Sequence, residues 1–97
     1  MLLNVYAYQL THWRDELPEV FRINEVIVRV FREQHLPEPA HCHVVWPDGM
    51  ARLTLPDLAP MRHSDPVPKR ARAEIVARLE DILDLWNQSN PMRSLAR

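Results

Sequence analysis

Alternation of hydrophobic and polar positions predicts strands in the first half of the chain. The clearest strand covers residues 26–32, where β-branched residues occur almost throughout. Because successive side chains of a strand leave opposite faces, Val26, Val28 and Val30 fall on one face and Arg29 on the other. The remaining predicted strands are residues 20–23, 41–46 and 50–55.

Short polar segments separate these strands and predict their connections. Asn24-Glu25 is a two-residue turn, and Pro47-Asp48-Gly49 is a strong hairpin signal in which we expect Gly49 to adopt a positive φ. Residues 34–40 are predicted to form a loop, because two closely spaced prolines are incompatible with a strand ladder. A proline-rich connection over residues 56–68 leads to the last element.

Hydrophobic positions repeat at helical spacing from residue 70 to residue 87. This pattern predicts an amphipathic helix, with Pro68 in its first turn, where a missing N–H costs nothing. We expect the helix to cover one face of the sheet. Its hydrophobic stripe consists of Ile75, Val76, Leu79, Ile82, Leu83 and Trp86.

Together these elements predict one α+β domain over residues 18–90. Its architecture is a small antiparallel sheet of about four strands, covered on one face by a C-terminal amphipathic helix. A chain of 97 residues has no room for a second core. Residues 1–17 fit a strand and a helix, so this extension stays undecided, and residues 91–97 are expected to fray.

The charge balance and the cysteine content argue against several classes of function. Twelve basic and thirteen acidic residues give a formal net charge of −1, so no global positive field attracts nucleic acid or an anionic membrane. Nucleic-acid binding would need a local basic cluster. Cys42 is the sole cysteine, which excludes an intramolecular disulfide and a thiolate zinc cage. With no signal-peptide pattern and no apolar run near the ~20 residues of a membrane span, we expect a cytoplasmic protein without membrane contacts.

Three histidines close together in the sequence are candidate metal ligands. His41 and His43 leave the same face of their predicted strand, and His35 precedes them in the loop. Imidazoles in this arrangement can hold Zn²⁺ and leave a position for water. However, a His-x-His pair without cysteines or a second spaced pair is a weak metal signal. We therefore expect no cofactor, and keep zinc at these three histidines as an alternative.

The second candidate site is the sheet face that the helix leaves uncovered. Such a surface could bind phosphate or an acidic partner, and its side chains could move protons and stabilise charge during phosphodiester cleavage. The alternative is a solvated face with arginines extended into water. Strand alternation assigns to this face Arg29, His41, His43 and Arg52, with Arg22 as a further candidate.

A basic patch lies at the start of the predicted helix, at Lys69, Arg70 and Arg72. Cations at this end oppose the helix dipole, so a bound acid or phosphate would explain them, and plain solvation is the simpler explanation. The residues expected to bind a partner or an anion are therefore Arg22, Arg29, Arg52, Lys69, Arg70 and Arg72.

The segment Gln34-His35-Leu36-Pro37-Glu38-Pro39-Ala40-His41-Cys42-His43-Val44 resembles a family of small bacterial proteins, catalogued as domain of unknown function 4160. That family is marked by a strand ending in His, a proline-containing turn, and His-x-His-Val opening the next strand. The resemblance covers residues 18 to about 90, including the opening hairpin and the closing helix. In this chain five residues separate His35 from His41, more than in the family pattern. The family has no established activity, but the resemblance implies a gene beside that of a second small protein, as in toxin–antitoxin pairs.

These observations support three hypotheses. The preferred one is a partner-binding component of a two-gene toxin–antitoxin-like module, whose partner is a small protein encoded by the neighbouring gene. It would bind through the open sheet face or an exposed edge strand. The second is a small ribonuclease-type toxin that uses His41, His43, Arg29 and Arg52. The third is a metal-binding domain. The sequence leaves open whether the chain is an enzyme.

Overall fold

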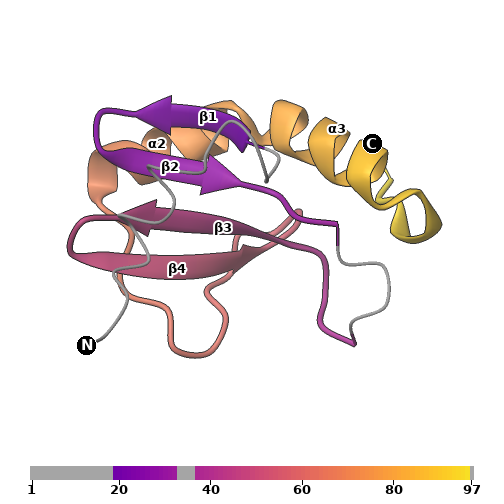
Figure 1. Cartoon of the computed structure of the whole chain (residues 1–97), viewed down its shortest axis with the longest axis horizontal. Helices are drawn as coiled ribbons and strands as arrows, with labels where there is room; N and C mark the ends of the chain where they lie inside the picture. The colour runs from indigo at the N-terminus through magenta and orange to yellow at the C-terminus, as the bar shows by residue number, and fades with distance from the viewer. Residues whose placement is uncertain (1–18, 33–36, 97) are drawn as a thin grey trace.

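The protein folds as a four-stranded antiparallel sheet with two helices packed on one face (Figure 1). The structure is a computed structural model that describes residues 19–32 and 37–96. The strands lie in sequence order across the sheet, which confirms the predicted α+β class. The elements are β1 (Glu19–Ile23), β2 (Val26–Arg29), β3 (His41–Trp46), β4 (Gly49–Thr54), α2 (Lys69–Ala77), α3 (Leu79–Ser89) and the 3₁₀ helix η1 (Pro91–Arg93).

The core forms between the helices and one face of the sheet. Alternate residues of β2 and β3 point into it, as the sequence pattern predicts, and Cys42 is among them with a fully buried side chain. Trp86 of α3 is the largest fully buried side chain among the residues that the structure describes. Burying one such large apolar side chain stabilises the fold by roughly 1.5–3 kcal/mol. The helix side of the core is therefore closed by Ile75, Ile82, Leu83 and Trp86 of the predicted amphipathic stripe, whereas Val76, also assigned to that stripe, is exposed.

The single predicted helix is divided in two at Arg78. Its backbone leaves helical geometry (φ −109°, ψ 20°), and its N–H is shared between the carbonyl oxygens of Glu74 and Ile75. The Arg78 guanidinium lies over the Phe21 ring of β1, 4.8 Å from the ring centroid. No glycine or proline occurs at this position, so the break has no local sequence signal and depends on packing against the sheet.

The sole glycine is required for a reason other than the one predicted. No glycine in the described chain has a positive φ, so the expected conformation of Gly49 is wrong. A Cβ atom at this position would lie 2.9 Å from the Trp46 ring and 2.8 Å from Asp65 Oδ2. Gly49 is therefore needed because the Trp46 indole packs directly against its backbone. In the first hairpin it is Asn24 that adopts the positive φ, of 51°.

The segment after α3 packs against the domain. Trp86 Nε1–H donates to the Arg93 carbonyl oxygen (2.9 Å), and Leu95 N–H donates to Asn87 Oδ1 (2.7 Å). Asn90 is fully buried, and its side-chain amide donates to the Phe31 carbonyl oxygen just after β2 (2.9 Å). Up to residue 96 the segment thus differs from the frayed tail that the sequence pattern suggested.

Candidate functional site

The strand register brings three of the predicted site residues into one row across the sheet. His43 of β3 lies directly opposite Arg29 of β2 on one side and Arg52 of β4 on the other. Directly paired residues of neighbouring strands project from the same face. The row lies on the face opposite the helices, because the core positions of β3 are the intervening Cys42 and Val44. The predicted sharing of one face by these side chains is therefore confirmed.

Neighbouring side chains hold this row in place. The Phe31 ring meets the His43 ring edge-on at a centroid distance of 4.3 Å, and the His41 ring lies 4.9 Å from His43. Arg52 donates a hydrogen bond to Glu38 Oε2 at 2.6 Å, within an ion pair. Glu38 lies in the loop before β3, and its role as the partner of Arg52 was not predicted. Glu38 and Arg52 are 14 residues apart, with β3 and a hairpin turn between them, so no local sequence pattern indicates their pairing.

The sheet face that carries the row is not an open surface. Arg29 is 0% exposed and His41 is 1% exposed, so the prediction of an uncovered face is wrong at these two positions. His41 Nδ1 lies 2.7 Å from the Pro39 carbonyl oxygen, which can only accept, so Nδ1 carries the proton. The His41 ring also lies 6.3 Å from the Trp86 ring of α3. A substrate therefore has no direct access to Arg29 or His41 in this structure.

Burial and neighbouring charge decide the protonation of the row. Burial, with further contributions from His41 and Arg52, lowers the pKa of His43 to about 3. The hydrogen bond from Arg52 lowers the pKa of Glu38 and keeps this carboxylate ionised. Burial raises the pKa of Cys42 to about 12, so this thiol is not a nucleophile near neutral pH. At neutral pH the row therefore contains a neutral imidazole between two guanidinium groups.

The metal hypothesis finds no site within the part of the chain that the structure describes. No three His, Cys, Asp or Glu side chains among residues 19–32 and 37–96 are grouped so that they could hold a metal ion. His35, the third predicted ligand, lies outside the described residues. Zinc binding at His35, His41 and His43 therefore stays a prediction.

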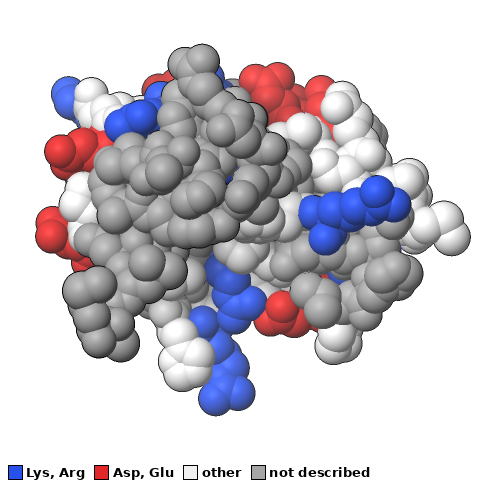
Figure 2. Space-filling view, in the orientation of Figure 1, with Lys and Arg blue, Asp and Glu red and all other residues white. Residues whose placement is uncertain are grey.

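The predicted basic residues do not form one continuous surface. Lys69, Arg70 and Arg72 are exposed in the first turn of α2, and Arg22 is exposed on β1, at the sheet edge away from β4. On the face shown in Figure 2, the visible lysines and arginines of the described chain lie in separate groups with acidic residues between them. The mixture of charges visible on this face agrees with the near-zero net charge.

The outer edge of β4 is occupied by the loop that follows it. Residues 50, 52 and 54 turn their backbone groups away from β3, and residues 58–65 supply a partner for each group. Three bonds use the β4 N–H groups: Met50 to Asp65 Oδ2 (3.0 Å), Arg52 to Ser64 Oγ (3.0 Å) and Thr54 to the Ala59 oxygen (2.8 Å). Three more reach the carbonyl oxygens of the same residues, from the N–H of Asp65 (2.8 Å), Met61 (2.8 Å) and Leu58 (2.6 Å).

The opposite edge of the sheet, β1, differs from β4. Its register with β2 (Phe21 opposite Val28, Ile23 opposite Val26) directs the backbone groups of Phe21 and Ile23 toward β2 and those of Arg22 outward. Within the described chain no hydrogen bond is recorded for the outward N–H or C=O of Arg22. The described sheet thus has one covered edge and one edge with unpaired backbone groups.

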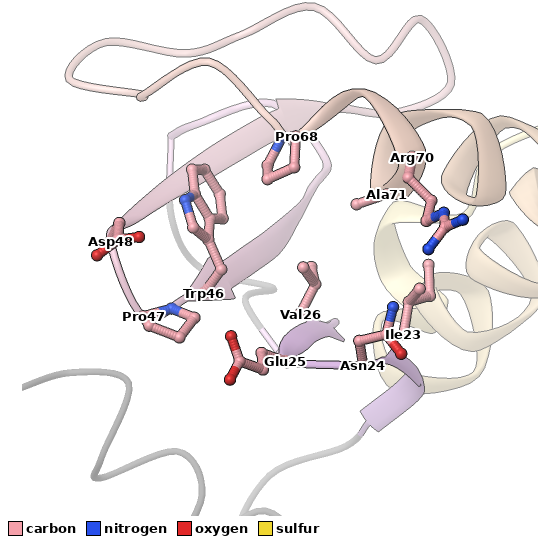
Figure 3. A pocket seen from close by; sticks show the side chains of 10 residues that line it. All are labelled: Ile23, Asn24, Glu25, Val26, Trp46, Pro47, Asp48, Pro68, Arg70 and Ala71. Carbon is pink, nitrogen blue, oxygen red and sulfur yellow. The ribbon is translucent and has the colours of Figure 1, made fainter.

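A pocket lies at the turn end of the sheet, away from the Arg–His row. It has a volume of about 520 Å³ and lies between the two hairpin turns and the start of α2 (Figure 3). Of the predicted site residues, Arg70 lines it. Trp46 of β3 forms part of the wall and is only 8% exposed. The sequence pattern did not predict this pocket, because its walls come from three segments far apart in the chain.

Comparisons with known proteins do not identify a relative of this chain. No family model, curated protein or solved structure matches the chain. The resemblance to the family of domain of unknown function 4160 therefore stays a prediction. None of the described helices has the length and apolar character needed to cross a membrane.

Proposed function

We propose that this protein binds an extended segment of a protein partner along the outer edge of β1. The observation that carries the proposal is the difference between the two sheet edges. The backbone groups that β4 turns outward are bonded to its own loop, while the outward groups of Arg22 in β1 have no hydrogen-bond partner among residues 19–32 and 37–96. An added strand would satisfy these groups by main-chain hydrogen bonds, as in other cases of strand addition.

Unpaired edges are an aggregation hazard, and folded proteins usually cover or blunt them. In this chain the loop after β4 performs that task through six hydrogen bonds. On β1 the described chain shows no equivalent cover, and Arg22 adds an exposed charge that discourages unselective pairing. An edge of this kind suits a specific partner better than self-aggregation.

The partner we propose is a small protein encoded by a neighbouring gene, in a toxin–antitoxin-like module. This part of the proposal depends on the family resemblance of residues 18 to about 90. The near-neutral net charge of −1 is compatible with a protein partner and needs no nucleic acid.

A second candidate function, a ribonuclease-type toxin, has the cross-strand row of Arg29, His43 and Arg52 in its favour. The burial of Arg29 and the pKa of His43 near 3 weaken it, because RNA needs access and a general base needs a pKa closer to neutral. The His43→Gln variant tests it in a growth-arrest assay. Wild-type toxicity from the folded variant would exclude a catalytic role for His43.

The edge proposal is tested by replacing Arg22 with proline and, separately, with alanine. Proline removes the outward N–H, and it is tolerated on edge strands where that group faces solvent. Alanine keeps the N–H but removes the same side chain, including its bond to the Asn24 carbonyl oxygen. Each variant is co-expressed with the neighbouring gene product, and co-purification is measured.

We expect the Arg22→Ala variant to retain the partner and the Arg22→Pro variant to lose it, with circular dichroism showing both folded. Retention by the folded proline variant would overturn the edge proposal. Absence of any association for the wild-type protein would overturn partner binding altogether. If the wild-type protein alone is a dimer and the proline variant a monomer, the edge binds a second copy of this chain, which also contradicts the proposal.

A further inference from the structure

The pocket at the turn end of the sheet has an acidic side and a basic side. In Figure 3, Trp46, Pro47 and Asp48 form one wall, and Arg70 extends from the start of α2 on the other. Glu25 lies below Trp46, and Val26 lies between the two walls. Carboxylates therefore border the side formed by the hairpin turns, and a guanidinium borders the side formed by the helix.

The charged groups around the pocket are available to a ligand. The side chains of Glu25, Asp48 and Arg70 are exposed, and the described chain shows no hydrogen bond or ion pair for any of them. The aromatic wall is firm, because Trp46 is nearly buried and packs against the Gly49 backbone. Rigid apolar walls with a few charged groups at the rim are typical of binding pockets, and about 520 Å³ lies within their usual range.

We propose that this pocket binds an apolar residue of the partner, flanked on one side by a basic residue and on the other by an acidic residue. The apolar side chain lies against Trp46 and Val26. The basic residue pairs with Glu25 and Asp48, and the acidic residue pairs with Arg70. Two oppositely charged rims select a dipolar segment over one with like charges.

This inference rests on the proposed function, because the occupant is a segment of the same partner. Ile23, the last residue of β1, also lines the pocket. A strand that pairs with the outer edge of β1 and continues beyond Ile23 therefore reaches the pocket rim. Main-chain bonds along the edge would supply affinity, and the pocket would supply selectivity for side chains.

The test uses short peptides with blocked ends, so it does not need the partner. The dipolar probes are acetyl-Arg-Leu-Glu-amide and acetyl-Glu-Leu-Arg-amide, and the like-charged probes are acetyl-Arg-Leu-Arg-amide and acetyl-Glu-Leu-Glu-amide. Each is titrated into the ¹⁵N-labelled protein, and the signals of the Trp46 indole N–H and the Ala71 amide are followed by NMR. We expect saturable shifts with at least one dipolar probe, and weaker binding of both like-charged probes.

The charge of the helix side is then reversed with Arg70→Glu. A carboxylate in the first turn of a helix is favourable, so the variant is expected to fold. Lys69→Glu is the matched control, because it makes the same change of charge one residue away and Lys69 does not line the pocket. Arg70→Glu should weaken the dipolar probe about fivefold and strengthen acetyl-Arg-Leu-Arg-amide, while Lys69→Glu leaves the order of the probes unchanged.

No saturable shift with any probe, or equal effects of the two variants, would overturn the pocket proposal. Neither result touches the test on Arg22, which measures retention of the whole partner. The peptide titrations and the co-purification of the Arg22 variants can therefore contradict the pocket proposal and the edge proposal independently of each other.

Discussion

His43 shows how burial changes the chemistry of a single side chain. A histidine on an alternating strand is expected to be partly exposed and to titrate near neutral pH. In the fold, His43 lies between Arg29 and Arg52, with the Phe31 ring edge-on to it. Burial, with further contributions from His41 and Arg52, lowers the pKa of His43 and disfavours the imidazolium form. The residue therefore acts as a neutral, packed group in the sheet.

This leads to a prediction for acid stability. The folded-state pKa of His43 is about 3 against an ordinary value of 6.5, so between these pH values the unfolded chain binds a proton that the native protein does not. The free energy of unfolding should therefore fall as the pH drops from about 6 toward 3, by at most about 1.4 kcal/mol per pH unit from this group. Urea denaturation at a series of pH values measures the slope.

The matched variant is His43→Gln, which keeps a polar side chain and does not titrate. Its free energy of unfolding should depend less steeply on pH over the same interval, whatever its stability at pH 7. Equal slopes for the two proteins would show that His43 does not carry a depressed pKa.

At the scale of elements, the two edge strands have different environments. The β4 edge is paired with residues 58–65, and this loop contains Pro60 and two residues with positive φ, Leu58 (60°) and His63 (66°). Such turns let a short segment bring successive backbone groups back to the strand it has just left. The loop is therefore part of the sheet's hydrogen bonding as well as a connection to α2.

Amide hydrogen exchange should separate the two edges. The outward N–H groups of Arg52 and Thr54 are bonded within the chain, whereas the outward N–H of Arg22 has no recorded partner in the described residues. We expect slow exchange at Arg52 and Thr54 and near-unprotected exchange at Arg22. Ile23, whose N–H faces β2, is the internal control on the same strand. Slow exchange at Arg22 would mean that this edge is covered in the free protein.

At the scale of the whole molecule, Asn90 connects the helix layer to the sheet. Its side-chain amide donates to the carbonyl oxygens of Phe31 (2.9 Å) and Trp86 (3.3 Å), and it is fully buried. Phe31 and Asn90 are far apart in the sequence, so this contact forms when the end of α3 packs beside the end of β2. Buried amides of this kind fix the relative position of two layers.

Replacing Asn90 with alanine should lower the free energy of unfolding by about 1–3 kcal/mol, because the Phe31 carbonyl oxygen loses this buried donor. Urea denaturation monitored by tryptophan fluorescence measures the change. Gln88→Ala, at an exposed position near the end of α3, is expected to stay within about 0.5 kcal/mol of the wild-type protein. A similar small effect of Asn90→Ala would show that the contact does not stabilise the native state.

Local patterns were sufficient for some of this architecture. Period-two alternation in residues 26–30 and 41–46 fixed which side chains share a face, because the strand backbone imposes that period. The grouping of Arg29, His43 and Arg52 follows from alternation once the strands pair in the observed register. Prolines and the Asn24-Glu25 pair marked the ends of strands, since their effect on the backbone is also local.

The sequence by itself determined the α+β class, the strands and their two faces, because these depend on the periodicity of neighbouring residues. Tertiary structure alone decided which groups are accessible and which are paired. It buries Arg29 and His41, covers the edge of β4, pairs Glu38 with Arg52, and forms the pocket beside Trp46. Each of these depends on contacts between segments far apart in the chain. Burial and long-range pairing are properties of the packed molecule, and no local pattern contains them.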